Sequence, residues 1–173
     1  MSTHGGTGGE MTPVPLTLDL LRHGAALQAG AGGDAARRLS PRGRSDLERL
    51  AAHLSGLGWR PGRAFTSPLV RAQESAALVL RPTAPELSAE VMLALRPDGD
   101  PAEVVEALAE NGVTTGHALL VGHQPLLGLL AAFLTARPAP ALSPGSLVRI
   151  EFTDRPEQGA GILGWRLVPD ALA

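Results

Sequence analysis

The chain has 173 residues, of which 44% are hydrophobic, and its 15 basic and 17 acidic residues leave a formal net charge of -2. This length and apolar content predict one compact soluble domain with a buried core. The balanced charge argues against nucleic acid or a membrane surface as a partner, because both usually select a basic excess or a basic stripe.

Three residue types are missing, and their absence excludes several kinds of chemistry. All the basic residues are arginines, which rules out a Walker-type lysine, a Schiff-base lysine and a lysine general base. Cysteine and tyrosine are absent as well, so disulfides, thiolate metal sites and cysteine nucleophiles are excluded. Histidine, serine, threonine and the carboxylates remain as nucleophiles or proton carriers.

The N-terminal segment differs in composition from the rest of the chain. It is rich in Gly, Pro and Thr and has neither the basic start nor the apolar run of a signal peptide. We therefore expect residues 1–13 to be a disordered tail and residues 14–173 to form a single domain. No apolar run reaches the length of a membrane span. Without a secretion signal or cysteines, a cytoplasmic location is expected.

The domain opens with a short apolar run and a longer amphipathic segment. Residues 16–21 predict a buried strand that ends abruptly at Arg22. Ser40 and Pro41 have the residue types of an N-cap and a first helical position. Leucines then recur at helical spacing as far as Gly58, which predicts a helix over this stretch.

The same alternation continues through the middle of the chain. Residues 63–66 predict a second strand, and Ser67 is interpreted as the N-cap of a helix that runs through Arg71 to about Leu80. A third strand is predicted over residues 90–93. Strands that alternate with helices are typical of a parallel sheet.

The second half begins with a predicted capping box. Asp100 is the expected cap, with Glu103 three residues later, and the helix is expected to end near Asn111. Residues 118–121 then form another continuous apolar run, which predicts a strand.

The remaining elements complete the predicted fold. A helix is expected to continue to Leu134, and residues 147–152 and 162–167 predict two strands joined by a Gly-rich turn, antiparallel at the sheet edge. The sequence therefore predicts an α/β fold: a three-layer α/β/α sandwich with a mainly parallel central sheet and an antiparallel edge.

Polar groups follow three of the predicted strands. Arg22 and His23 follow the first strand, Arg71 follows the second, and His123 follows a later one. In an open parallel sheet the carboxyl ends of the strands share one edge, where ligands bind. Two arginines and two histidines can therefore converge on one phosphate-sized anion, with no metal ion needed, because guanidinium groups neutralise phosphate oxygens. Gly24 would allow the backbone to approach that ligand closely.

Three motifs carry a family resemblance. Leu-Leu-Arg-His-Gly at 20–24, Ser-Pro-Leu-Val-Arg-Ala at 67–72 and Gly-His-Gln-Pro at 122–125 occur in order. They resemble the histidine phosphatase superfamily, and most of all its short phosphohistidine phosphatases of the SixA type. The resemblance runs from about residue 16 to the C-terminal strands. It implies a phosphoglycerate mutase-like fold and an enzyme that hydrolyses phosphate groups without a cofactor.

The resemblance also implies a role for each matched residue. His23 would be the nucleophile, forming a phosphohistidine that water then hydrolyses. Arg22 and Arg71 would hold the phosphoryl oxygens, with Gly24 beside them. His123 would bind the phosphoryl group and donate a hydrogen bond that stabilises the transition state.

The sequence departs from the larger mutase-like branch of the family. That branch prefers Ser and Asn where this chain has Ala26 and Ala29, and it uses a carboxylic acid to protonate the leaving group. Asp98 and Asp100 are candidates for that acid, as is Glu90, although Asp100 is equally well explained as a helix cap. A weak or missing general acid favours phosphohistidine over a phosphomonoester as substrate, since imidazole, with a pKa near ~6.5, leaves more easily than an alkoxide.

Three functions follow from this reading. The first is hydrolysis of phosphohistidine on a protein, and the second is hydrolysis of a small phosphorylated metabolite. The third is a non-catalytic phosphate-binding module on the same scaffold. Hydrolysis of protein phosphohistidine is the preferred hypothesis.

Other polar residues have simpler interpretations. Arginines 37, 38, 42 and 44 form a basic cluster near the expected pocket, for which a solvated surface is the default and docking of an acidic phosphoprotein the alternative. His53 lies within a predicted helix, His4 in the tail and His117 before a strand, and none is expected in the site. For Ser67, the N-cap is the first interpretation, and contact of its hydroxyl with the phosphate is the second.

Overall fold

The computed structural model describes residues 15–172. The predicted tail, residues 1–13, lies outside them. The strands are β1 (Leu16–Arg22), β2 (Arg63–Thr66), β3 (Glu90–Val91), β4 (Gly116–Gly122), β5 (Leu147–Phe152) and β6 (Ile162–Leu167). The helices are α1 (Pro41–Gly56), α2 (Val70–Thr83), α3 (Pro101–Glu110) and α4 (Leu126–Thr135), with short 3-10 turns at Asp34–Ala36, Leu93–Leu95 and Pro169–Ala171.

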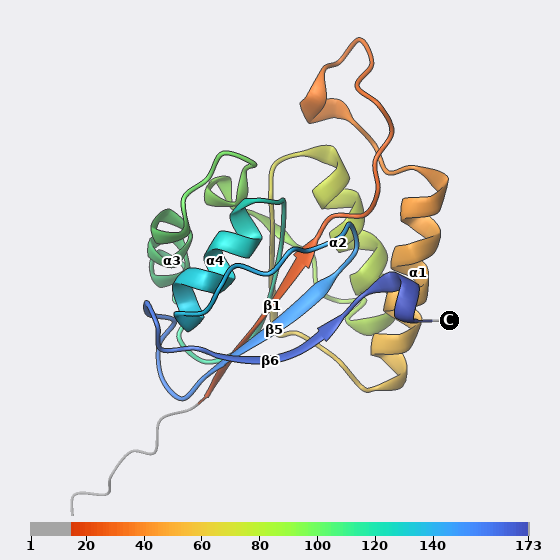
Figure 1. Cartoon of the computed structure of the whole chain (residues 1–173). Helices are drawn as coiled ribbons and strands as arrows, with labels where there is room; N and C mark the ends of the chain where they lie inside the picture. The colour runs from red at the N-terminus through yellow and green to blue at the C-terminus, as the bar shows by residue number, and fades with distance from the viewer. Residues whose placement is uncertain (1–14, 173) are drawn as a thin grey trace, which may run out of the picture.

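The six strands form one sheet in the order β3-β2-β4-β1-β5-β6. β3, β2, β4 and β1 are parallel, whereas β5 and β6 run antiparallel to their neighbours. The predicted three-layer α/β/α sandwich with a mainly parallel sheet and an antiparallel edge is therefore confirmed (Figure 1).

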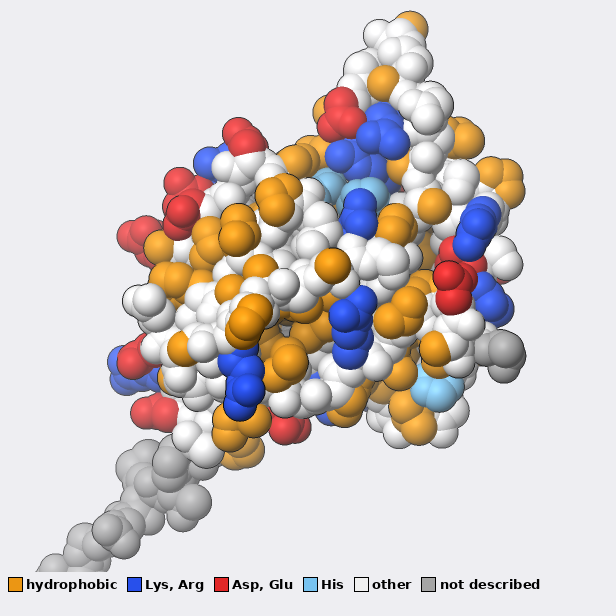
Figure 2. Space-filling view, in the orientation of Figure 1, with side chains coloured by type: hydrophobic (Ala, Val, Ile, Leu, Met, Phe, Trp, Pro, Cys, Tyr) orange, Lys and Arg blue, Asp and Glu red, His pale blue; other side chains and the backbone are white. Residues whose placement is uncertain are grey.

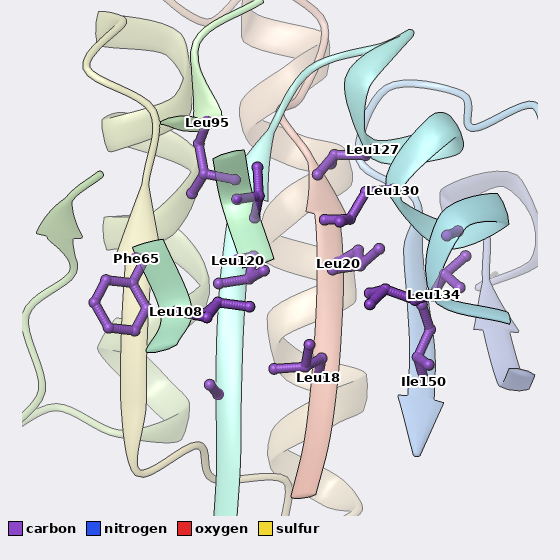
Figure 3. Close-up of a cluster of buried hydrophobic side chains, with 14 of the residues drawn as sticks. Leu18, Leu20, Phe65, Leu95, Leu108, Leu120, Leu127, Leu130, Leu134 and Ile150 are labelled. Carbon is purple, nitrogen blue, oxygen red and sulfur yellow. The ribbon is translucent and has the colours of Figure 1, made fainter. Parts of the chain in front are cut away.

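Alternation along the strands divides the core between two faces of the sheet. Leu18 and Leu20 of β1 point to the cluster covered by α3 and α4, where Figure 3 shows Leu20 beside Leu130. Leu21 points to the opposite cluster, which α1 and α2 cover. Both faces are buried, as expected of a parallel sheet between two helical layers.

The predicted helix starts are only partly confirmed. The Ser40 hydroxyl accepts a hydrogen bond from the backbone N–H of Gly43, so it caps α1 as predicted. Ser67 is not an N-cap: α2 begins at Val70, its N-cap is Leu69, and no side chain bonds there. The prediction was wrong because the Ser67 hydroxyl is used by another residue, described below.

Two further predictions need correction. The third strand covers only Glu90–Val91, and the chain then turns into the 3-10 segment Leu93–Leu95. Asp100 caps α3 by accepting the N–H of Ala102, but no reciprocal capping box forms, because the Glu103 carboxylate pairs with Arg96 at 3.1 Å. A salt bridge to the preceding loop thus replaces the backbone contact.

A buried polar network crosses the sheet at Asp19 of β1. This carboxylate is fully buried, and it accepts hydrogen bonds from Trp59 (2.6 Å) and His117 (2.6 Å) and two from Arg149 (2.9 and 2.8 Å). Burial alone raises the pKa of Asp19, but the hydrogen bonds from Arg149 and His117 outweigh it and hold the pKa below its ordinary value. His117 lies within β4 rather than before it.

Among the described residues, no helix has the length and apolar character that crossing a membrane requires.

Candidate active site

The predicted site residues lie at the carboxyl ends of β1, β2 and β4. Arg22 at the end of β1 is paired with Gly122 at the end of β4. The residues that follow these two strands, His23 and His123, therefore leave the sheet side by side. The segment between β1 and α1 rises above this edge (Figure 1), and histidine and arginine side chains gather at its base (Figure 2).

These side chains line one cavity of about 420 Å³. Its walls are Arg22, His23, Ala25, Ala26, Arg37, Arg71, Pro97, His123, Gln124 and Pro144. Four of the five predicted catalytic and phosphate-binding residues are thus brought together, from three different strand ends. The fifth, Gly24, does not line the cavity.

His23 is held in one orientation and in one neutral form. Its Nδ1 lies 2.7 Å from the carbonyl oxygen of Gly24 and donates to it, which leaves a lone pair on Nε2. Nε2 accepts the Nε–H of Arg71 at 3.3 Å. Burial, together with the charges of Arg71 and Arg22, lowers the pKa of His23 to about 4 despite the Gly24 bond. The ring is therefore neutral at physiological pH, as a nucleophile must be.

His123 stands beside this ring, with 4.9 Å between the two ring centroids. Its Nε2 is 2.7 Å from the Ser67 hydroxyl, which accepts the Leu69 backbone N–H at 3.3 Å. Its Nδ1 is buried and has no hydrogen-bond partner among residues 15–172. Burial, with the neighbouring His23 and Arg71, lowers the pKa of His123 to about 3. With Ser67 donating to Nε2, the single ring proton belongs on Nδ1.

The two arginines are anchored differently. Arg22 donates from Nη1 to the carbonyl oxygen of Leu142 at 2.6 Å, and its buried Nε has no partner in the part of the chain that the structure describes. Arg71 is 5% exposed and donates from both terminal nitrogens to Asp34, to the backbone oxygen at 2.9 Å and to the carboxylate at 3.2 Å. Each guanidinium is thus fixed at one end by the protein.

Asp34 and Arg37 were not predicted to belong to the site. Arg37 lines the cavity and pairs with the Asp34 carboxylate at 3.0 Å, while that carboxylate also pairs with Arg71. Three guanidiniums and one carboxylate leave two positive charges in excess, which match a phosphoryl dianion. One signal was available: Asp34 is the only charged residue in the segment 24–36.

The structure does not bring the candidate acids to the cavity. Asp98 has an 84% exposed side chain that pairs with Arg96, and Asp100 accepts the backbone N–H of Ala102 as the cap of α3. Glu90 pairs with Arg63 on the edge of the sheet. None of the three lines the cavity, and its walls include no Asp or Glu of the described residues.

Gly24 is needed for packing rather than for approach to a ligand. A Cβ atom there would lie 2.8 Å from Cδ1 of Leu47 and 3.0 Å from the carbonyl oxygen of Gly43, both on α1. The expectation that its missing side chain faces the phosphate is therefore corrected: it makes room for α1 to contact the backbone that follows β1.

Among residues 15–172, no group of three or more metal-ligating side chains is arranged to hold a metal ion. The basic cluster is mostly paired with acids: Arg38 and Arg44 share Glu74, and Arg42 lies between Asp46 and Asp170.

Comparison with known proteins identifies the class. The family model of the histidine phosphatase superfamily (branch 1) matches residues 18–96. A bacterial relative is 32% identical over 154 residues, a match that covers 87% of this chain and 92% of the relative. The chain therefore belongs to the histidine phosphatase superfamily, as the motifs predicted.

That relative is the phosphohistidine phosphatase SixA of Escherichia coli (strain K12). The protein histidine phosphatase SixA complexed with tungstate has the same fold, with a TM-score of 0.76 and 28% identity over 91% of this chain and 99% of that chain. A phosphoglycerate mutase from Bacillus anthracis str. Sterne matches with a TM-score of 0.66 and 18% identity over 88% of this chain and 93% of that chain. The expected phosphoglycerate mutase-like fold is thus confirmed.

Proposed function

We propose that this protein hydrolyses phosphohistidine on a partner protein, with Nε2 of His23 as the nucleophile. The observation that carries the proposal is the bond from Nδ1 of His23 to the Gly24 carbonyl, which leaves the lone pair of a neutral ring on Nε2, beside Arg71. The resemblance to the phosphohistidine phosphatase SixA supports the same reaction.

The reaction has two steps. The lone pair of His23 attacks phosphorus in line with the P–N bond of the substrate. That bond breaks as the new N–P bond forms, and the substrate ring, protonated on its other nitrogen, leaves as neutral imidazole. Water then attacks phosphorus, inorganic phosphate departs, and the lone pair returns to Nε2 of His23.

The neighbouring side chains stabilise the charge that develops on the phosphoryl oxygens. Arg22 and Arg71 carry N–H groups for two of these oxygens, and Arg37 adds a third positive charge to the cavity. The ring N–H on Nδ1 of His123, which has no partner among the described residues, is the proposed donor in the transition state. Guanidinium charge takes the role that a metal ion has in other phosphatases, so the proposed reaction needs none.

The chemistry of the leaving group favours phosphohistidine over a phosphomonoester. Among the described residues, no Asp or Glu lines the cavity. The Asp34 carboxylate pairs with two arginines of the cavity walls, Arg37 and Arg71. Their hydrogen bonds and charges lower the pKa of Asp34, so this carboxylate is ionised and has no proton to donate, whereas an alkoxide leaving group benefits strongly from an acid. Imidazole, with a pKa near ~6.5, leaves without it. We assign no general acid, and Asp98 and Asp100 have no role in the proposed reaction. The cytoplasmic location expected from the sequence stays a prediction.

Trapping of the phosphoenzyme tests the nucleophile. The protein is mixed with a ³²P-labelled phosphohistidine protein, quenched rapidly under alkaline conditions, and separated on a denaturing gel. Wild type and His53→Ala, which changes an exposed helix histidine, should both be labelled, whereas His23→Ala should not. Label on His23→Ala would overturn the assignment of the nucleophile.

Rates on different substrates separate the alternatives. Turnover should be faster on the phosphohistidine protein than on alkyl phosphates such as sugar phosphates. The reverse order would make the protein a small-molecule phosphomonoesterase. Binding of phosphate with no label and no turnover on any substrate would make it a phosphate-binding module.

A further inference from the structure

We propose that Ser75 is a positioning residue for the nucleophile: it holds Gly24 in place and thereby keeps the proton of His23 on Nδ1. The proposal rests on His23 as the nucleophile of the proposed function. Ser75 is not among the described residues that line the cavity, so we assign it no contact with the phosphoryl group.

The contacts of Ser75 connect the two segments that carry His23 and Arg71. Ser75 lies on α2, one helical turn after Arg71, and is fully buried. Its hydroxyl accepts the backbone N–H of Gly24 at 3.1 Å and donates to the backbone oxygen of Arg71 at 2.6 Å. Since the hydroxyl has one hydrogen, which goes to the Arg71 carbonyl, its role toward Gly24 is that of an acceptor.

Gly24 needs such an anchor. A glycine has no side chain to restrict its backbone, and its carbonyl oxygen is the group that accepts Nδ1–H of His23. Ser75 binds the N–H of the same residue. Without the hydroxyl, this buried N–H would have no partner, and the backbone would move to regain one. The carbonyl oxygen would then move away from the ring of His23.

The position of this carbonyl matters most when substrate is bound. In the free protein, the Nε–H of Arg71 also keeps the proton off Nε2 of His23. A phosphoryl group takes over the donors of Arg71, so the Gly24 carbonyl is then the contact that selects the tautomer. A ring with its proton on Nε2 has no lone pair facing phosphorus and cannot attack.

The test compares Ser75→Ala with Thr83→Val as a matched control. Thr83 is a buried hydroxyl residue of the same helix that donates to the backbone oxygen of its own preceding turn, that of Val79, at 2.7 Å. The ¹⁵N shifts of the His23 ring are recorded with and without inorganic phosphate, and kcat and KM are measured on a phosphohistidine protein. These shifts distinguish the two tautomers directly.

Ser75→Ala should show a mixture of His23 tautomers when phosphate is present and a kcat lowered roughly tenfold to a hundredfold, with KM nearly unchanged. Ser75→Thr, which keeps a hydroxyl, should restore the single tautomer, and Thr83→Val should behave as wild type. If Ser75→Ala does not fold, Ser75→Cys, whose thiol hydrogen-bonds weakly, replaces it with the same expected results.

A Ser75→Ala protein with the wild-type tautomer and wild-type kcat would overturn the proposal. The ring shifts are measured without turnover. A wild type that forms no phosphoenzyme would therefore contradict the proposed function, while the shifts would still decide whether Ser75 holds the ring.

Discussion

The Nε atom of Arg71 lies 3.3 Å from Nε2 of His23, although the two residues are 48 positions apart and belong to different elements. A fixed guanidinium charge thus faces the lone pair of the proposed nucleophile. It disfavours protonation of the ring, and in the proposed reaction the same charge attracts the phosphoryl group.

Replacement of Arg71 should impair catalysis far more than folding. Arg71→Ala removes the charge beside His23 and its bonds to Asp34, and kcat/KM should fall by about 10²–10³-fold. The melting temperature should change little, because the partner carboxylate is largely exposed. Steady-state kinetics on a phosphohistidine protein and thermal unfolding of the same sample measure both effects. Unchanged kcat/KM would remove Arg71 from the site.

The pKa of His23 predicts activity at unusually low pH. Because that pKa is lowered to about 4, the ring stays neutral and nucleophilic as pH falls from 7 to 5, a range in which an ordinary histidine becomes protonated. The His23 ring signals in an NMR titration should move near pH 4 and stay constant between pH 7 and pH 5. A His23 transition near 6.5 would contradict this prediction.

The negative charge of Asp34 should oppose the binding of phosphate, so its removal should strengthen that binding. Asp34→Asn removes a negative charge that pairs with Arg71 and Arg37 but keeps an oxygen that can accept from Arg71. We expect the dissociation constant for inorganic phosphate to fall by roughly threefold at low salt, with a smaller change at 0.5 M NaCl because salt screens exposed charges. Titration calorimetry measures it.

The control for this variant is Asp98→Asn, which neutralises an exposed carboxylate outside the cavity. It should leave the dissociation constant unchanged. Equal effects of the two substitutions would show that only the net charge of the protein matters, and not the position of Asp34.

The buried carboxylate of Asp19 should stabilise the fold in a pH-dependent way. Asp19→Asn leaves the buried side of Arg149 without its charged partner, so the free energy of unfolding at pH 7 should fall by about 3 kcal/mol. Because the pKa of Asp19 is lowered in the folded protein, its contribution is complete above the ordinary value of 3.8 and is lost as pH falls through the folded pKa.

Urea unfolding of wild type and Asp19→Asn at several pH values tests this. The difference between the two should be constant from pH 7 to pH 5 and should shrink below about pH 4. A difference that does not change with pH would mean that the carboxylate acts through its shape and not through its charge.

Much of the fold was accessible from local patterns. Strands β2, β5 and β6 have the bounds that their apolar runs predicted, and Ser40 and Asp100 cap helices as expected. Such signals depend on neighbours within a few residues along the chain, so the sequence alone is enough to predict them. The convergence of Arg22, His23, Arg71 and His123 followed from one topological rule, that parallel strands end at the same edge.

The errors within the site concern residues whose contacts are distant in the sequence. Ser67 has the sequence context of an N-cap, yet its hydroxyl binds His123, 56 positions away. Gly24 is small because α1 packs against it, and Asp34 reaches Arg71 across 37 positions. None of these contacts follows from a periodic or local pattern, although the isolated charge of Asp34 in the segment 24–36 marked that residue.

The amino-acid sequence by itself determined the class of fold, because that depends on hydrophobic periodicity. It also determined which strand ends have the candidate site residues and which histidine is the candidate nucleophile, because these depend on residue type. The tertiary structure alone decided the tautomer and low pKa of His23, the partner of each arginine and the absence of a carboxylic acid from the cavity walls. Those properties arise from burial and from distances of a few ångströms between segments that the chain keeps far apart.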